Sequence, residues 1–165
     1  MNRSSLIILT LLLIIQSACL HSDIFEKNIA IPGHAWQENF KPEYTFNITD
    51  TSSSYDLKLT FRHTDAYPYA NLWLKVTMQQ PGETKDSTLK IEIPLAQENG
   101  KWLGKGMNEI WEHELPLSKN ANVIRFKKTG MYKIKLQHIM RVNPLPQVMS
   151  IGVRLVKIES TSHNL

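Results

Sequence analysis

Residues 55–78 read YDLKLTFRHTDAYPYANLWLKVTM, and this stretch decides the fold class because it holds two strand patterns with a polar connection between them. Apolar side chains take every second position in 55–61 and again in 72–78, the period of a strand with one face in a core. The intervening residues break that alternation. We therefore expect two strands joined by a loop.

The connection collects charged, amide and aromatic side chains within a short span. Because loops on a rigid β scaffold often carry binding groups, we predict a partner or ligand surface here. Its members are Arg62, His63, Asp65, Tyr67, Tyr69, Asn71 and Trp73. The alternative is that these side chains satisfy backbone groups at the corner between strands, as Asx-type and arginine-to-carbonyl contacts do.

Strand patterns continue over most of the chain. Apolar residues alternate, or nearly so, in 44–48, 89–95, 110–117, 132–138 and 151–155. No segment shows three helical turns of apolar residues at a spacing of about 3.6. About eight or nine short strands with turn signals between them predict an all-β fold, an antiparallel two-sheet β-sandwich of the jelly-roll or immunoglobulin-like kind.

Glycines mark three of the connections. Pro81-Gly82 has the order that a type II turn requires and predicts a hairpin between its flanking strands. Asn99-Gly100 predicts a type I′ turn, because both central residues of that turn need a positive φ. The pair Gly104 and Gly106 lacks the third glycine and the helix of a nucleotide loop, so it predicts a bulge or a close backbone approach.

The composition is that of an ordinary globular protein. The chain has 165 residues, of which 42% are hydrophobic and 21% charged, which excludes a disordered or multi-span membrane protein. This length leaves room for one domain. The formal charge of +4 comes from lysines scattered along the strands, and no basic cluster of the kind that binds nucleic acid is present.

The N-terminus has the pattern of an export signal. Residues 1–18 contain Arg3, an apolar run too short to span a bilayer, and small residues directly before Cys19, the single cysteine of the chain. Since one cysteine cannot form an internal disulfide, we predict that Cys19 is lipidated, as at the end of a bacterial lipobox. Two or three acyl chains would anchor the protein firmly.

These boundaries divide the chain into four parts. Residues 1–18 form a lipoprotein signal peptide, and 19–23 form a lipidated short tether. Residues 24–160 form a single sandwich domain, followed by a loose tail at 161–165. The short tether keeps the domain near its membrane.

Catalytic and metal-binding patterns are missing from the sequence. There is no Gly-x-Ser-x-Gly elbow, and His63 with Asp65 has no serine partner. His113 and His138 continue apolar alternations, which favours histidines in the core or at a sheet edge over metal ligands. We therefore expect no enzyme activity, no cofactor and no metal.

The aromatic residues suggest a second possible function. Tyr67, Tyr69 and Trp73 lie near one loop, and such a platform on a β-sandwich can stack on sugar rings. Large aromatic side chains are more often part of a core. A lipid-anchored carbohydrate-binding module remains the alternative function.

Several short motifs occur in order along the chain: the lipobox Cys19, residues 62–73, Gly100 to Gly104, Gly130 to Tyr132, Met140-Arg141 and Ile151 to Val153. Together they resemble the gliding-motility lipoprotein family GldH of Bacteroidota. The resemblance covers nearly all of the chain after the signal peptide and carries no catalytic residues.

The resemblance implies a non-catalytic lipoprotein of a Gram-negative cell envelope. Its role would be that of an accessory or assembly component of the gliding machinery and the type IX secretion linked to it. Its expected partners are other proteins of that machinery, together with the membrane that holds Cys19. The four residues after Cys19 lack an acidic run like that of surface-export signals, so we expect the domain to face the periplasm.

Overall fold

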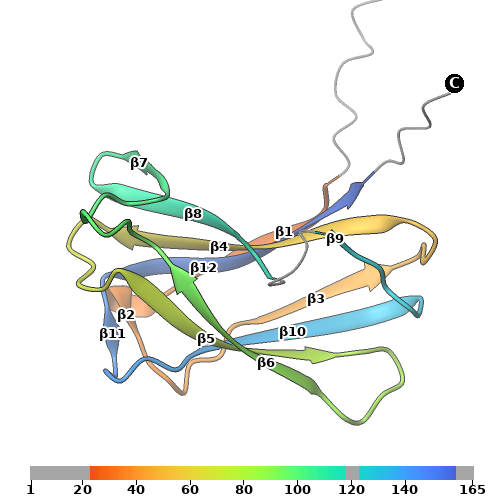
Figure 1. The fold of residues 1–165 in the computed structure, drawn as a ribbon. Coiled ribbons are helices and arrows are strands. Elements are labelled where there is room, and N and C mark those ends of the chain that lie inside the picture. The colour runs from red at the N-terminus through yellow and green to blue at the C-terminus, as the bar shows by residue number, and fades with distance from the viewer. Residues whose placement is uncertain (1–22, 118–122, 159–165) are drawn as a thin grey trace, which may run out of the picture.

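The computed structural model describes residues 23–117 and 123–158. The predicted signal peptide, Cys19 and the tail at 161–165 lie outside this part. Two antiparallel sheets are stacked face to face in it, with their strands running roughly along one axis (Figure 1). The prediction of an all-β, two-sheet sandwich is therefore confirmed.

The first sheet has the strand order β1-β12-β4-β8-β7, and β9 also pairs with β4. Its strands are β1 (Asp23–Ala30), β4 (Ser54–Thr64), β7 (Lys105–Met107), β8 (Ile110–Pro116), β9 (Val123–Ile124) and β12 (Val148–Ile158). β1 starts at Asp23, a residue that the sequence placed in the tether, because its backbone already pairs with β12 there.

The second sheet has the order β3-β10-β5-β6. Its strands are β3 (Glu43–Ile48), β5 (Asn71–Gln79), β6 (Ser87–Pro94) and β10 (Gly130–His138). A short pairing of β2 (Ala35–Trp36) with β11 (Leu145–Pro146) closes one end, next to the 3₁₀ turn Pro32–His34.

The core fills the space between the two sheets. In β4 and β12 the alternating apolar residues face each other in register, with Phe61 opposite Ile151 and Leu59 opposite Val153. The fully buried residues of both sheets include Leu59, Phe61, Leu72, Leu74, Ile134, Leu136, Ile151 and Val153. Tyr44 of β3 crosses this layer and donates a hydrogen bond of 2.6 Å to the carbonyl of Ile151. Apolar burial of this kind is the main force holding the sheets together.

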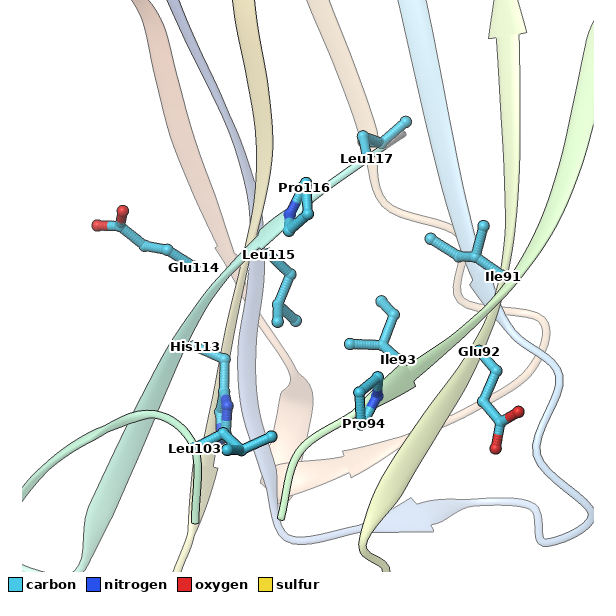
Figure 2. Close-up of a pocket in the computed structure, with 10 residues that line it drawn as sticks. All are labelled: Ile91, Glu92, Ile93, Pro94, Leu103, His113, Glu114, Leu115, Pro116 and Leu117. Atoms are coloured by element: carbon cyan, nitrogen blue, oxygen red, sulfur yellow. The ribbon is translucent and has the colours of Figure 1, made fainter. Parts of the chain in front are cut away.

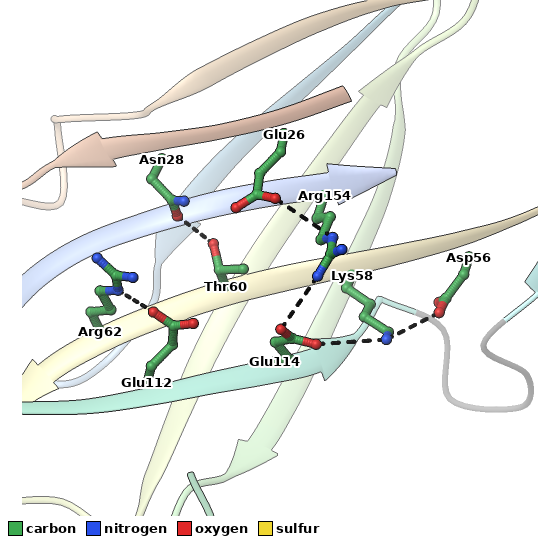
Figure 3. A network of polar contacts seen from close by, with 9 residues as sticks. All are labelled: Glu26, Asn28, Asp56, Lys58, Thr60, Arg62, Glu112, Glu114 and Arg154. Atoms are coloured by element: carbon green, nitrogen blue, oxygen red, sulfur yellow. Dashed lines mark hydrogen bonds and ion pairs between the residues drawn. The ribbon is translucent and has the colours of Figure 1, made fainter. Parts of the chain in front are cut away.

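The outer face of the first sheet is polar (Figure 3). A row of ion pairs crosses four strands, with N–O distances between 3.2 and 3.7 Å. Its members in order are Glu26, Arg154, Glu114, Lys58 and Asp56. Because the pairs are partly exposed to solvent, each contributes only about 0–1 kcal/mol to stability.

One predicted turn is confirmed and one is wrong. Gly82 has φ 72°, and the amide of Glu83 donates to the carbonyl of Gln80, as in a type II turn. At Asn99-Gly100 only the glycine has a positive φ, so the turn is not type I′. Two successive positive φ values occur instead at Asn108 and Glu109, between β7 and β8.

The close approach predicted at Gly104 and Gly106 is confirmed. A Cβ on Gly104 would lie 2.5 Å from the carbonyl oxygen of Glu112, and one on Gly106 would lie 2.8 Å from the ring of Trp111. These glycines let the segment before β8 lie flat against that strand, with the ring of Trp111 packed on Gly106.

Candidate functional site

The loop between β4 and β5 is shorter than the sequence indicated. β4 continues through Thr64 because β8 pairs with it along Arg62, His63 and Thr64. β5 starts at Asn71, which leaves residues 65–70 as the connection. Arg62 lies on the polar outer face, where it forms an ion pair with Glu112. The prediction of a loop from residue 62 is therefore wrong.

Two of the predicted surface residues are buried. His63 is fully buried, and only 3% of Tyr67 is exposed. The Tyr67 hydroxyl donates to the carbonyl of Asn71 across the loop, and its ring packs edge-on against Phe61. His63 and Tyr67 therefore belong to the core at this end of the sandwich, and the expectation that they present a binding surface is wrong for both.

Asp65 fixes the loop to the neighbouring strands. Its Oδ1 accepts hydrogen bonds from the indole nitrogens of Trp102, at 3.2 Å, and Trp111, at 3.0 Å. Its amide donates to the carbonyl of Glu109 at 2.8 Å. The sequence singled out Asp65 but not its partners, which lie 37 and 46 residues further along the chain.

We expect Asp65→Ala to lower the free energy of unfolding by about 1–2 kcal/mol, because two indole N–H groups lose an acceptor that water replaces only in part. Asp65→Asn keeps an acceptor oxygen and should lose less than half as much. Denaturant titration followed by tryptophan fluorescence measures both. Equal losses for the two variants would contradict a role as hydrogen-bond acceptor.

His63 and His113 form a buried pair. Their Nε2 atoms are 3.0 Å apart, and Nδ1 of His63 lies 2.7 Å from the carbonyl of Thr64. A carbonyl only accepts, so Nδ1 of His63 carries the proton, Nε2 accepts, and Nε2 of His113 donates. Burial lowers the pKa of His63. Burial, and then the charge of His63, lower the pKa of His113 to about 4. Both rings are neutral at pH 7.

His138 is the third buried histidine. Its ring is fully buried and lies edge-on to the indole of Trp36, with 5.2 Å between the ring centroids. Burial lowers its pKa. The expectation of core or edge positions for His113 and His138 is confirmed, and no group of three metal-ligating side chains occurs among residues 23–117 and 123–158.

The remaining candidates, Tyr69, Asn71 and Trp73, line a groove of about 440 Å³. Its other wall is the segment 139–142 that follows β10. This segment is fixed to β5: the amide of Ile139 donates to the carbonyl of Trp73, and the Trp73 amide donates to the sulfur of Met140. Residues 62–73 and Met140-Arg141, two separate motifs in sequence, thus meet in one place.

The groove combines an aromatic surface with polar groups at its rim. Trp73 is 39% exposed, the largest exposure of the four tryptophans. Asn71 donates from its amide to Glu92 of β6 at 2.7 Å, and Arg141 is exposed. An exposed indole beside an amide and a guanidinium is suited to contact a protein or a sugar, and it contains no nucleophile paired with a base.

The groove lies far from the start of the domain. β1 begins at the end of the sandwich where β12 finishes, whereas the β4–β5 connection and β11 lie at the opposite end (Figure 1). Within the described residues no helix has the length and apolar character needed to cross a membrane.

Comparisons with known proteins agree with the sequence motifs. The chain is 27% identical to a gliding motility lipoprotein GldH homolog of Christiangramia forsetii, over 94% of this chain and 97% of that protein. It is 28% identical to gliding motility lipoprotein GldH of Flavobacterium johnsoniae, over 90% and 93% respectively.

A search of solved structures finds a distant likeness to a carbohydrate-binding module, CBM28, specific for non-crystalline cellulose. The TM-score is 0.41 and the identity 11%, over 82% of this chain and 73% of that one. The family model of the GldH lipoproteins matches residues 23–155, nearly the whole described domain. The chain therefore belongs to the GldH lipoprotein family.

Proposed function

We propose that this protein is a lipid-anchored envelope lipoprotein of the gliding machinery. It acts without catalysis, through contact with other proteins. Its partners belong to the gliding machinery and to the type IX secretion system linked to it. Family membership and the names of its relatives support the motility role. The observation that carries the contact role is the groove at Trp73, which has an exposed aromatic side chain and rim polar groups.

The position of the groove favours a contact role. With Cys19 anchored, the four residues to Asp23 reach at most about 14 Å, so the end where β1 begins lies close to the membrane. The groove is at the other end of the sandwich (Figure 1). It would face proteins of the periplasm, where we place the domain.

Trp73→Ala tests this proposal. We expect it to weaken capture of motility components by about 2 kcal/mol or more, because exposed aromatic side chains supply much of the energy of an interface. The melting temperature should change by only a few degrees, since Trp73 is outside the core. Mild cross-linking in cells, followed by mass spectrometry of the purified protein, measures capture.

Met131→Ala is a matched control. Met131 is 56% exposed and lies on the same sheet, on β10, away from the groove. It should leave capture unchanged. If Trp73→Ala and Met131→Ala capture equally well, the contact surface lies elsewhere; if Trp73→Ala melts early, the loss of capture is a folding effect.

The same groove supports a second candidate function, the binding of a glycan. The exposed Trp73 ring provides a stacking surface, and Asn71 and Arg141 beside it provide donors for hydroxyl groups. Binding of the purified protein to a glycan array, lost in Trp73→Ala and kept in Met131→Ala, would favour this function over protein contact.

The anchor at Cys19 has its own test. Cys19→Ser should release the protein to the soluble fraction or leave an uncleaved precursor, because no thiol remains to be acylated. Metabolic labelling with a fatty-acid analogue should mark the wild type and not the variant. Equal labelling would contradict the anchor.

Removal of the domain by protease added to intact cells would contradict the periplasmic orientation.

A further inference from the structure

The side of the sandwich between β6 and β8 is open and apolar. A groove of about 440 Å³ runs between the two strands. Ile91 and Ile93 of β6 point toward it from one sheet, and Leu115 points toward it from the other (Figure 2). Leu103, which also lines the groove, is 51% exposed, and Leu89, two residues before Ile91 on β6, is 40% exposed. Apolar side chains at an open side of a sandwich are suited to contact another chain.

β6 also has one unpaired edge. It is the last strand of its sheet, bonded to β5 on one side only. The amide of Leu95 donates to Ala70, which precedes β5, so by alternation the backbone groups of Lys90 and Glu92 point away from β5. Such an edge is a template for pairing with a further strand.

The charges on β6 define what strand would fit. On the outer face, Lys90 lies directly opposite Lys75 of β5, an arrangement of like charges that is unfavourable across a sheet. Among the described residues no ion pair is formed by Lys90. A strand that placed a carboxylate on the free side of Lys90 would offset this repulsion.

We propose that this strand is β6 of a second copy of the chain, and that the protein forms a two-fold dimer through antiparallel β6–β6 pairing. When the two-fold axis passes between the Ile91 residues of the two copies, Lys90 of each copy lies opposite Glu92 of the other. The backbone N–H and C=O groups of both residues then point toward the β6 strand of the other copy. A register centred on Lys90 or on Glu92 would place like charges opposite each other. The self-complementary charge pattern therefore selects one register.

The same register covers the apolar groove. Leu89, Ile91 and Ile93 of the second copy would continue the inner face of the second sheet across the open side. The axis is perpendicular to that sheet, so the first sheets of both copies, with their β1 strands, lie on one side of the pair. Because the strands of the two copies run antiparallel, the two β1 starts lie at opposite ends of the pair, and both anchors reach one membrane when the strands lie along its surface. Each Trp73 groove then stays at the end opposite its own anchor. Confinement to one membrane raises the effective concentration of the two chains. The dimer does not depend on the function proposed for the Trp73 groove.

Sedimentation equilibrium of the full-length lipoprotein in detergent tests the dimer. We expect a reversible monomer–dimer equilibrium. Lys90→Glu replaces both cross-copy ion pairs by repulsions and should raise the dissociation constant by about tenfold or more. The double variant Lys90→Glu with Glu92→Lys restores the complementarity and should return the constant to within about threefold of the wild type.

Lys133→Glu is the control for net charge, because Lys133 lies on the outer face of the same sheet but on β10, away from β6. It should not change the dissociation constant. A wild-type protein that stays monomeric at all accessible concentrations would overturn the proposal. So would a dimer that Lys90→Glu and Lys133→Glu weaken equally.

Cross-linking tests the register. Chains with Lys90→Cys and chains with Glu92→Cys, carrying different tags, should join efficiently through a short thiol-specific reagent. Chains with Thr88→Cys mixed with Lys90→Cys chains are the matched control, because those positions are four residues out of register. Equal yields in the two mixtures would show that the copies associate through another surface, which also overturns the proposal.

Discussion

Transfer from pH 7 to pH 5 is expected to lower the free energy of unfolding by about 2 kcal/mol through His113 alone. Burial, and then the charge of His63, depress the pKa of His113 from 6.5 to about 4 in the folded protein. The unfolded chain therefore binds more protons between these two values. The stabilisation is complete above pH 6.5, falls as the pH drops below 6.5, and is fully lost below about pH 4.

His63 and His138 act in the same direction, since burial lowers the pKa of each. The Nε2–Nε2 distance of 3.0 Å between His63 and His113 leaves room for one proton, so the two rings cannot both become charged in place. Acidification should therefore destabilise the end of the sandwich that carries the β4–β5 connection before it affects the rest.

His113→Gln isolates this effect. Glutamine keeps an N–H donor for His63 but does not titrate, so the loss between pH 7 and pH 5 should shrink by about 2 kcal/mol. Urea titrations at several pH values measure it. Gly152→Ala serves as the control, because it should lower stability equally at each pH. An unchanged pH dependence in His113→Gln would contradict the assignment.

The alternation of apolar residues predicted much of the fold. It placed strands at β3, β4, β5, β6, β10 and β12, because each has one face against the core. The same alternation also predicts which way His63 and Trp73 point. His63 continues the inward positions of 55–61, so it should be buried. Trp73 falls between the inward residues Leu72 and Leu74, so it should point outward. The density of polar residues in this stretch suggested a loop and hid the signal for His63, whereas Trp73 was assigned to the surface as observed.

The contacts of Asp65 had no signal in the sequence. They depend on the register of β8 against β4, which places Trp111 opposite His63, and on the β7–β8 turn at Asn108 and Glu109, where the Glu109 carbonyl accepts from the Asp65 amide. Asparagine followed by glutamate is not a strong marker for two positive φ values, whereas asparagine followed by glycine is. The type I′ turn was therefore predicted at Asn99-Gly100 and not at Asn108-Glu109. Trp102 and Trp111 were therefore not assigned to the Asp65 corner.

Gly152→Ala is expected to lower the free energy of unfolding by about 2 kcal/mol, and Gly152→Val by about 3–4 kcal/mol. Gly152 lies in β12 between Asn28 of β1 and Thr60 of β4, and the side chains of these two residues meet above it in a hydrogen bond (Figure 3). A Cβ on Gly152 would overlap both the Asn28 Oδ1 and the Thr60 Oγ1 atoms. Thr60 is only 5% exposed, so its displaced hydroxyl group would lose its partner away from water.

The loss of stability in Gly152→Ala should depend only on the side chains of Asn28 and Thr60. In a background with Asn28→Ala and Thr60→Ala, both overlapping atoms are gone, and Gly152→Ala should then be neutral or stabilise by about 0.5 kcal/mol, because glycine weakens a strand interior. Denaturant titration of the four proteins in this cycle gives the coupling free energy. If Gly152→Ala costs as much in the double-alanine background as in the wild type, the glycine serves the backbone of β12 and not the Asn28–Thr60 bond.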